Sequence, residues 1–299
     1  MSDIHIEKGN NSFRGMEMNE ARDIAQHANL PFVLAELQED HGMSEEEAKE
    51  HVISAAHKAG LDLKIVSVGG STGFVTSNPE TNEITVSFDP CMSSQNIKFW
   101  PKEHSLGGKV FAGVQGALTE ENEDGFFVDQ LKDAIIEAAD KLGENATLRV
   151  TGMSKGAAMS VSAVGQWMSE GFFKENPNIT LKSIHSFGPS PCGNAEFAET
   201  FEAKAKEMGV DVWHITGGEA DPVPTLFTDE GPWYTNPPIM DDYVHVGTQI
   251  DLQGVTGHRM DSYIEALHTP QGLDIMSFDQ GTSANFPEQV PPTPTPLGL

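Results

Sequence analysis

The sequence contains few cysteines, few basic residues and no long apolar run. Its two cysteines, Cys91 and Cys192, are far apart among 299 residues, so they form neither a metal-ligand motif nor a disulfide-rich framework. We expect free thiols and no metal, although a bridge between the two stays open. No apolar run approaches the ~20 residues needed to cross a bilayer. The chain is therefore not expected to be an integral membrane protein.

The shortage of basic residues gives the chain a strong negative charge. Lysine and arginine together number 18 against 45 acidic residues, for a formal net charge of −27. This balance argues against a nucleic-acid partner and against spontaneous adsorption to anionic membranes. The amino-terminal MSDIHIEKGNNSF is polar and lacks the apolar region of a secretory signal. We expect a soluble protein, either cytoplasmic or exported by a signal-independent route, of undetermined oligomeric state.

A chain of this length can bury a single substantial core. We predict a flexible amino terminus over residues 1–15 and one catalytic domain over 16–285. The last residues, 286–299, contain a PPTPTP run and are predicted to be a disordered tail. Two helices are predicted within residues 16–60, where they would cover one side of a sheet.

Strand and helix patterns alternate through the rest of the domain, which predicts an α/β fold. Alternation of this kind is typical of a largely parallel sheet with helices on both faces. The predicted strands are 61–68, 72–76, 83–88, 146–152, 181–187 and 210–216, and the predicted helices after residue 60 are 126–142, one after Ser154, and 195–208.

The stretch ATLRVTGMSKGAAMS, residues 146–160, has the form of a nucleophile elbow. An alternating apolar strand leads into Gly152-Met-Ser154-Lys-Gly156, and a helical pattern of small residues follows. A sharp turn of this kind holds a serine in a strained conformation and projects its hydroxyl toward a base. The backbone N–H of Lys155 would then face a developing oxyanion. The alternative is a simple Gly-Ser loop between a strand and a helix.

A serine nucleophile requires an imidazole base and a carboxylate that orients it. In α/β-hydrolases both follow the serine, in the order acid and then histidine. Asp221 is the preferred acid, because it follows an apolar strand and is stiffened by the flanking Pro222. His258, at a predicted loop-to-helix junction, is the preferred base, whereas His245 lies in an alternating pattern typical of a structural histidine. The remaining candidates are Asp229, Asp241 and Asp242 for the acid and His268 for the base.

With these residues identified, the chain resembles the class 3 (fungal-type) lipases of the α/β-hydrolase superfamily. The resemblance covers roughly residues 61–267 and rests on several segments in the family's order. These segments are GGKVFAGV (107–114), SFG with GN and FA (186–198), DPVP (221–224), YVHVG (243–247), and HRMDSY (258–263).

The resemblance implies a lipase or phospholipase that acts on acylglycerol or phospholipid esters. Ser154, His258 and Asp221 would form the catalytic triad, with an acyl-enzyme intermediate and no cofactor. The expected partner is a lipid or small ester substrate, with transient contact at a lipid surface. Alternatives are a short-chain carboxylesterase, an acyltransferase, or a homologue that binds a lipid or a protein without catalysis.

The chain also departs from the family pattern. The usual elbow is GHSLGG, whereas this chain has Met153 and Lys155 around the serine, and its tyrosine follows His258 two positions later than in DHxxY. Lys155, beside the serine, could aid an anionic substrate, but the preferred interpretation is an exposed, solvated side chain at the start of a helix. The FRGT segment of the family corresponds to residues 88–91, so the second oxyanion donor would be the N–H of Cys91, because Pro90 has none.

In the family, the segment after this strand forms a lid. Here Ile97, Phe99 and Trp100 form an apolar cluster within residues 92–106. They would cover an acyl pocket in water and turn outward at a lipid surface. The alternative is that these side chains fill the core beside the sheet.

Overall fold

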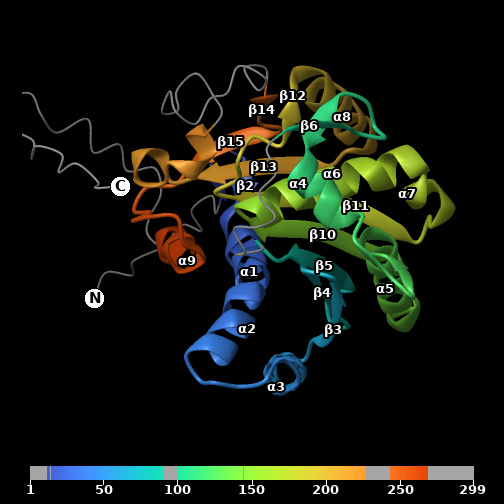
Figure 1. Ribbon diagram of the computed structural model, residues 1–299, viewed down its shortest axis with the longest axis vertical. Coiled ribbons are helices and arrows are strands. Elements are labelled where there is room, and N and C mark those ends of the chain that lie inside the picture. The colour runs from blue at the N-terminus through green and yellow to red at the C-terminus, as the bar shows by residue number, and fades with distance from the viewer. Residues whose placement is uncertain (1–11, 14, 91–99, 144, 227–242, 269–299) are drawn as a thin grey trace, which may run out of the picture.

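A seven-stranded sheet forms the centre of the molecule (Figure 1). The computed structural model describes residues 12–13, 15–90, 100–143, 145–226 and 243–268. Strand order is β15-β13-β11-β10-β5-β4-β3. Strands β5, β10, β11, β13 and β15 run parallel to one another, and β4 pairs antiparallel with both β5 and β3. The largely parallel sheet of the prediction is confirmed. The strands are β3 (Asp62–Val68), β4 (Ser71–Asn78), β5 (Glu83–Phe88), β10 (Ala146–Met153), β11 (Ile179–Phe187), β13 (Asp211–Thr216) and β15 (Thr248–Asp251).

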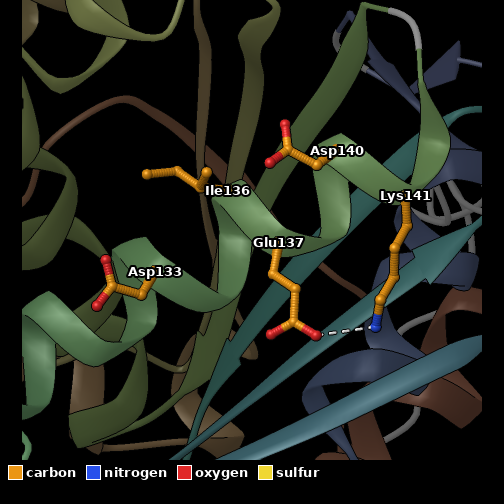
Figure 2. A pocket seen from close by; sticks show the side chains of 5 residues that line it. All are labelled: Asp133, Ile136, Glu137, Asp140 and Lys141. Carbon is orange, nitrogen blue, oxygen red and sulfur yellow. Dashed lines mark ion pairs between the residues drawn. The ribbon is translucent and has the colours of Figure 1, made fainter.

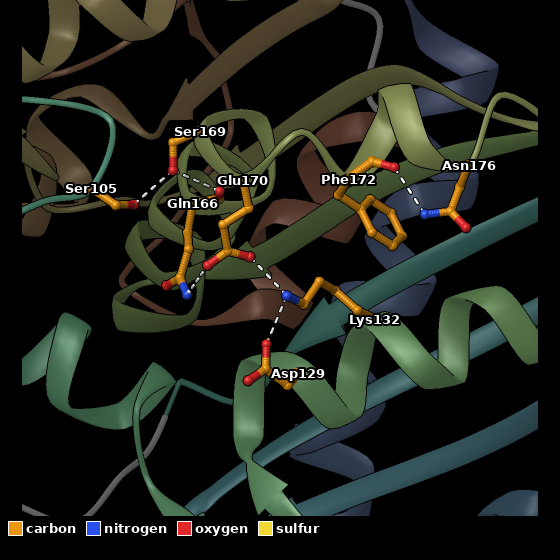
Figure 3. Close-up of polar contacts among 8 residues, drawn as sticks. All are labelled: Ser105, Asp129, Lys132, Gln166, Ser169, Glu170, Phe172 and Asn176. Carbon is orange, nitrogen blue, oxygen red and sulfur yellow. Dashed lines mark hydrogen bonds and ion pairs between the residues drawn. The ribbon is translucent and has the colours of Figure 1, made fainter.

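One face of the sheet is covered by helices with apolar inner sides. Alternation along β10 directs Leu148 and Val150 to this face, where they join the largest apolar core. Lys132 on one of these helices bridges Asp129 and Glu170 and ties two helices together (Figure 3). The helices on this side are α4 (Ala112–Leu118), α5 (Phe127–Leu142), α6 (Lys155–Glu170), α7 (Phe172–Glu175) and α8 (Ala195–Met208).

The opposite face is covered by α1 (Met18–Ala28), α2 (Leu30–Glu39), α3 (Glu45–Lys58) and α9 (Met260–His268) (Figure 1). The amino-terminal helices therefore cover one side of the sheet, as predicted.

The number of amino-terminal helices was predicted incorrectly, since three helices, not two, lie within residues 16–60. The first predicted helix divides at Asn29, and α2 begins just beyond it with Pro31 in its first turn. Proline has no N–H to continue the hydrogen-bond ladder of a preceding helix, but it fits the first turn of a new one. At the start of α3, Ser44 and Glu47 form a capping box, with Ser44 N donating to Glu47 Oε2 at 2.9 Å and Glu47 N to Ser44 Oγ at 3.3 Å.

A small antiparallel sheet, in the order β14-β12-β7-β6, lies beside the central one. Asn194 Oδ1 accepts from Lys109 N at 2.8 Å and from Phe197 N at 3.2 Å, which joins this sheet to the start of α8. No helix in the described residues is long and apolar enough to cross a membrane. The remaining strands are β6 (Pro101–Glu103), β7 (Lys109–Phe111), β12 (Gly193–Asn194), β14 (Tyr243–Val244), and the pairs β1 (Ser12–Phe13) with β2 (Met16–Glu17) and β8 (Glu121–Asn122) with β9 (Gly125–Phe126).

The predicted disordered tail, residues 286–299, lies outside the described residues.

Candidate active site

Ser154 stands at the turn between β10 and α6 in a strained backbone conformation. Its φ is +57° and its ψ is −124°, and Asn82 is the only other non-glycine residue with positive φ in the described part of the chain. Such a conformation costs about 1–3 kcal/mol and persists where the surrounding structure enforces it. One enforcing contact is the hydrogen bond from Ser154 N to Phe187 O at 2.9 Å. The strand-turn-helix context predicted from the sequence is present.

The two glycines of the elbow allow β5, β10 and α6 to approach closely. A Cβ atom on Gly152 would collide with the backbone of Gly156 and lie 2.8 Å from Ala157 N. A Cβ atom on Gly156 would collide with Phe88 O at the end of β5. Backbone atoms cannot move aside as a side chain can, so larger residues at either position are incompatible with this turn.

Asp221 lies in the loop after β13, between the 3-10 turns Gly218–Ala220 and Val223–Thr225, and is fully buried. Its Oδ1 accepts from Val223 N at 3.0 Å. Burial opposes ionisation, but hydrogen bonds from His258 and Tyr263 outweigh it and keep the pKa of Asp221 below its usual value. The carboxylate is therefore charged and held in one orientation at neutral pH.

His258 faces this carboxylate at the start of the segment that leads into α9. Its Nδ1 lies 3.0 Å from Asp221 Oδ1 and 2.9 Å from Oδ2. A histidine that donates from Nδ1 to a carboxylate keeps Nε2 unprotonated, as a base requires. The His258 side chain is 27% exposed, whereas Asp221 has no exposed surface, so the ring can reach a substrate.

Tyr263, in the first turn of α9, completes the environment of Asp221. Its hydroxyl donates to Asp221 Oδ2 at 2.6 Å. Burial, followed by the nearby Asp221 charge, raises the pKa of Tyr263 far above its usual value, so the phenol stays a neutral donor. The unusual spacing between His258 and this tyrosine does not prevent the contact, because α9 begins only at Met260 and the intervening loop takes up the two extra residues.

Gly188 connects the serine to the acid–base pair. A Cβ atom at Gly188 would lie 2.7 Å from Asp221 Oδ2 and 3.2 Å from His258 Nδ1. Its neighbour Phe187 accepts the hydrogen bond from Ser154 N. The three predicted residues thus lie around one dipeptide at the end of β11. Sequence reasoning assigned no role to Gly188, although a glycine directly after a buried strand is a signal of close approach.

The described residues contain no hydrogen bond between Ser154 Oγ and His258. Catalytic hydrogen bonds are often long before substrate binds and shorten in the reacting complex.

Lys155 opens α6, so its N–H has no partner within the helix and lies beside the nucleophile. The second donor was predicted at the end of β5. There, Asp89 N already donates to Thr72 O at 3.0 Å, and Pro90 has no N–H. Cys91, the predicted second donor, lies outside the described residues.

The Lys155 side chain is not the solvated group that the sequence predicted. Its Nζ atom is buried and has no hydrogen-bond partner in the part of the chain that the structure describes. A lysine at the start of a surface helix ordinarily extends into water, whereas the first turn of α6 is packed against the end of β5.

The predicted lid cluster is described only in part. Ile97 and Phe99 lie outside the described residues, whereas Trp100 is 57% exposed just before β6. Trp100 therefore does not fill the core, as the alternative reading would require. Its covering of an acyl pocket stays a prediction.

The predicted structural role of His245 agrees with its contacts. Its Nε2 lies 2.7 Å from Pro224 O, within the Asp221 loop. Its ring stacks on His214 of β13, with centroids 4.1 Å apart. The rival acids, Asp229, Asp241 and Asp242, lie outside the described residues.

Other candidate sites in the described residues offer no comparable chemistry. A hollow along α5 is lined by Asp133, Ile136, Glu137, Asp140 and Lys141 (Figure 2), and Lys64 and Lys141 lower the pKa of Glu137 to about 2. It contains no nucleophile or base of the triad. No cluster of three metal-ligating side chains occurs in the described part of the chain, and Cys192 is a free, buried thiol.

Residues 65–231 match the family model of class 3 lipases, more than half of the chain. The chain belongs to the class 3 lipase family. Membership supports a lipase-type hydrolase.

Solved structures of fungal lipases share the fold. A lipase from Rhizopus microsporus var. chinensis is 16% identical with a TM-score of 0.53, over 81% of this chain and 75% of that chain. A mutant protein from Penicillium cyclopium is 19% identical with a TM-score of 0.52, over 80% of each chain. A triacylglycerol lipase with a serine-protease triad as its catalytic centre is 18% identical with a TM-score of 0.52, over 80% of each chain. A comparison with curated protein sequences gave no match.

Proposed function

We propose that this class 3 lipase hydrolyses carboxylic esters of acylglycerols or phospholipids through Ser154, His258 and Asp221. The observation that carries the proposal is the placement of the Asp221–His258 pair against Gly188, beside the carbonyl that holds the strained Ser154 backbone. A strained backbone at the serine would project its hydroxyl toward the oriented imidazole, which nucleophilic attack requires.

The first half of the reaction forms an acyl-enzyme. His258 Nε2 takes the proton from Ser154 Oγ as the oxygen attacks the ester carbonyl, and Asp221 stabilises the imidazolium that forms. The N–H of Lys155 binds the negative oxygen of the tetrahedral intermediate. His258 then gives its proton to the departing alcohol. In the second half, His258 takes a proton from water as the water oxygen attacks the acyl carbon. The bond to Ser154 Oγ then breaks, His258 returns the proton to Ser154, and the carboxylic acid leaves.

Tyr263 and Val223 maintain the acid during this cycle. Their hydrogen bonds occupy one lone pair on each Asp221 oxygen, and both interactions favour the ionised carboxylate. Because Asp221 is buried, its charge acts on His258 with little screening by water.

Covalent labelling tests the proposal directly. A fluorophosphonate probe should label the wild-type protein, and Ser154→Ala should abolish both labelling and ester hydrolysis. Asp221→Asn should lower kcat by about 10⁴-fold, because the amide no longer favours the reactive tautomer. A folded wild-type protein that does not react with the probe would support a non-catalytic, lipid- or protein-binding homologue instead.

The kind of ester is tested by the physical state of the substrate. Turnover of one ester should rise sharply as its concentration passes the critical micelle concentration, if a lipid surface is the working substrate. A smooth saturation curve without a rise at that point would indicate a short-chain carboxylesterase. Adding a competing alcohol and measuring transesterification identifies an acyltransferase.

A further inference from the structure

The candidate active site contains one charged side chain that the proposed triad does not use. Lys155 follows the nucleophile directly, and its Nζ atom is buried without a hydrogen-bond partner among the described residues. No carboxylate in the described residues lies within 4.0 Å of this atom. Leaving a buried amine unpaired costs free energy, so such a group in a native protein calls for an explanation.

The nearest carboxylate of the triad does not meet this need. Asp221 receives its hydrogen bonds from Val223, Tyr263 and His258, and none from Lys155. Lys155 is therefore not a fourth member of the acid–base system.

The place of Lys155 in α6 sets the direction of its side chain. Side chains of a helix tilt toward its amino terminus. Lys155 is the first residue of α6, so we expect its side chain to project past the helix start, toward the carboxyl edge of the sheet where β10 ends at Met153. The reacting ester occupies that edge in the proposed mechanism. The amino end of α6 adds partial positive charge there.

This local positive charge contrasts with the rest of the chain, whose formal net charge is −27. Lysines elsewhere in the described part of the chain include members of ion pairs, such as Lys132 with Glu170 at 2.7 Å. The elbow of the resembling family places an uncharged leucine where this chain has Lys155. Among the described residues, no carboxylate neutralises this cation beside the site of ester attack.

We propose that Lys155 is a specificity-determining residue that binds an anionic group, a phosphate or a carboxylate, on the ester substrate. The inference rests on the proposed function, because it places this anion beside the ester that Ser154 attacks. The anion would donate no proton and break no bond. It would neutralise the Lys155 ammonium and fix the substrate relative to Ser154 Oγ.

The test compares pairs of esters in which one member carries an anionic group and the other does not. Lys155→Met keeps the length of the side chain and the backbone N–H but removes the charge, whereas Lys155→Arg keeps the charge. Lys132→Met removes one positive charge elsewhere and is the matched control. For each protein, kcat/KM is measured for didecanoyl phosphatidic acid and for didecanoylglycerol in micelles of a nonionic detergent. A second pair, a hemisuccinate ester and the corresponding neutral butyrate ester, separates carboxylate from phosphate recognition.

Lys155→Met should lower the ratio of kcat/KM for the anionic over the neutral ester by about 10- to 100-fold, the usual range for a charge-assisted hydrogen bond. Lys155→Arg should retain most of the ratio, and Lys132→Met should leave it within about twofold, as expected of an exposed ion pair. The pair of esters whose ratio falls identifies the anion as a phosphate or a carboxylate. An unchanged ratio for both pairs in Lys155→Met overturns the inference.

A binding measurement separates this inference from the proposed function. Hexyl phosphate should bind to Ser154→Ala protein, and adding Lys155→Met should weaken that binding by about tenfold or more. Equal binding by the two proteins overturns the inference even if esters are hydrolysed. If the wild-type protein hydrolyses no ester, the proposed function fails, and the hexyl phosphate result alone decides the role of Lys155.

Discussion

Both faces of the central sheet pack apolar side chains against helices, but the face under α1 also carries a row of polar side chains. The face under α4, α5 and α6 is apolar, with residues such as Leu148 and Val150 in one continuous core. On the opposite face, under α1, cross-strand register places Thr76, Thr85, Arg149 and Ser183 in one row across four neighbouring strands. One strand, β10, contributes to both faces by alternation alone.

The polar row makes a dense set of contacts with α1. Glu20 Oε1 accepts from Arg149 Nε at 3.0 Å and from Ser183 Oγ at 2.9 Å. Arg149 also pairs with Glu83 at 2.5 Å. Further along α1, His27 Nδ1 lies 2.9 Å from Thr76 Oγ1. Burial opposes the charge on Glu20, but its hydrogen bond with Lys182 and the Arg149 charge together keep its pKa below the usual value.

The comparison separates the roles of the two faces. An apolar interface gains free energy from burial but tolerates small shifts, whereas a paired buried charge requires specific geometry. We infer that the polar row fixes the position of α1 on the sheet. Arg22 Nε of α1 donates to Leu267 O of α9 at 2.8 Å, and α9 contains Tyr263, so this face also supports Asp221.

The largest effect is expected from breaking the charge pairs under α1. Arg149→Leu should lower the free energy of unfolding by about 3–5 kcal/mol, because the partly buried carboxylates of Glu83 and Glu20 both lose a cationic partner. In the described part of the chain, Glu20 then keeps only its contacts with Lys182 and Ser183. Urea unfolding at pH 7 measures this change. Adding Glu20→Gln and Glu83→Gln should recover at least half of it.

On the apolar face, Val150→Ala serves as the control for this experiment. The cavity that this substitution leaves should lower the free energy of unfolding by about 2–3 kcal/mol. Adding Glu20→Gln and Glu83→Gln should not restore that stability. If the triple variant is no more stable than Arg149→Leu alone, unpaired charge is not the cause of the loss.

Acid should destabilise both faces through buried histidines. Burial lowers the pKa of His185, which faces α1, to about 3, and burial with the neighbouring His245 lowers the pKa of His214 to about 3. The unfolded chain binds protons near pH 6.5, so the native state retains its full stability above that pH. Each histidine then costs about 1.4 kcal/mol per pH unit as the pH falls from about 6.5 toward 3.

Unfolding free energies at pH 7, 5.5 and 4.5 test this linkage. His185→Gln and His214→Gln should each flatten the pH dependence by a similar amount, because one group on each face is removed. If the free energy of unfolding falls with pH as steeply in both variants as in the wild type, the assignment of the pH dependence to these two histidines is contradicted.

A smaller effect is expected where the polar face meets the site. Tyr263→Phe removes a hydrogen bond to a charged group and should cost about 1.5–3 kcal/mol of stability. The pKa of Asp221 should rise in this variant, and an NMR titration of the Asp221 carboxyl carbon measures that rise. A titration of Asp221 identical to that of the wild type would show that Tyr263 does not act on this carboxylate.

The smallest effect is expected from the exposed ion pairs beside the apolar face. Lys132 bridges Asp129 and Glu170 near the surface (Figure 3). Lys132→Met should cost less than about 1 kcal/mol, and 1 M salt should remove most of that difference. A loss as large as that of Arg149→Leu would show that partial exposure does not distinguish these pairs from the buried ones.

Local sequence patterns predicted much of the site. The glycines of the elbow and the strands that lead to Ser154 and Asp221 all depend on nearest neighbours. The division of the first helix was missed, although Pro31 signals it locally. The burial of Lys155 Nζ could not be predicted, because it depends on how closely α6 approaches β5, and that distance is set by packing between segments far apart in the chain.

The sequence by itself determined most of the order of strands and helices, the strained turn at Ser154 and the family, because these follow from periodicity, glycine positions and motif order. The tertiary structure decided which polar groups meet. Arg149 and Glu20, which form a hydrogen bond, are 129 residues apart in the sequence. Tyr263 and Asp221 are 42 residues apart. Contacts of this kind arise only when sheet register and helix packing are set together, because each depends on the position of the whole chain around it.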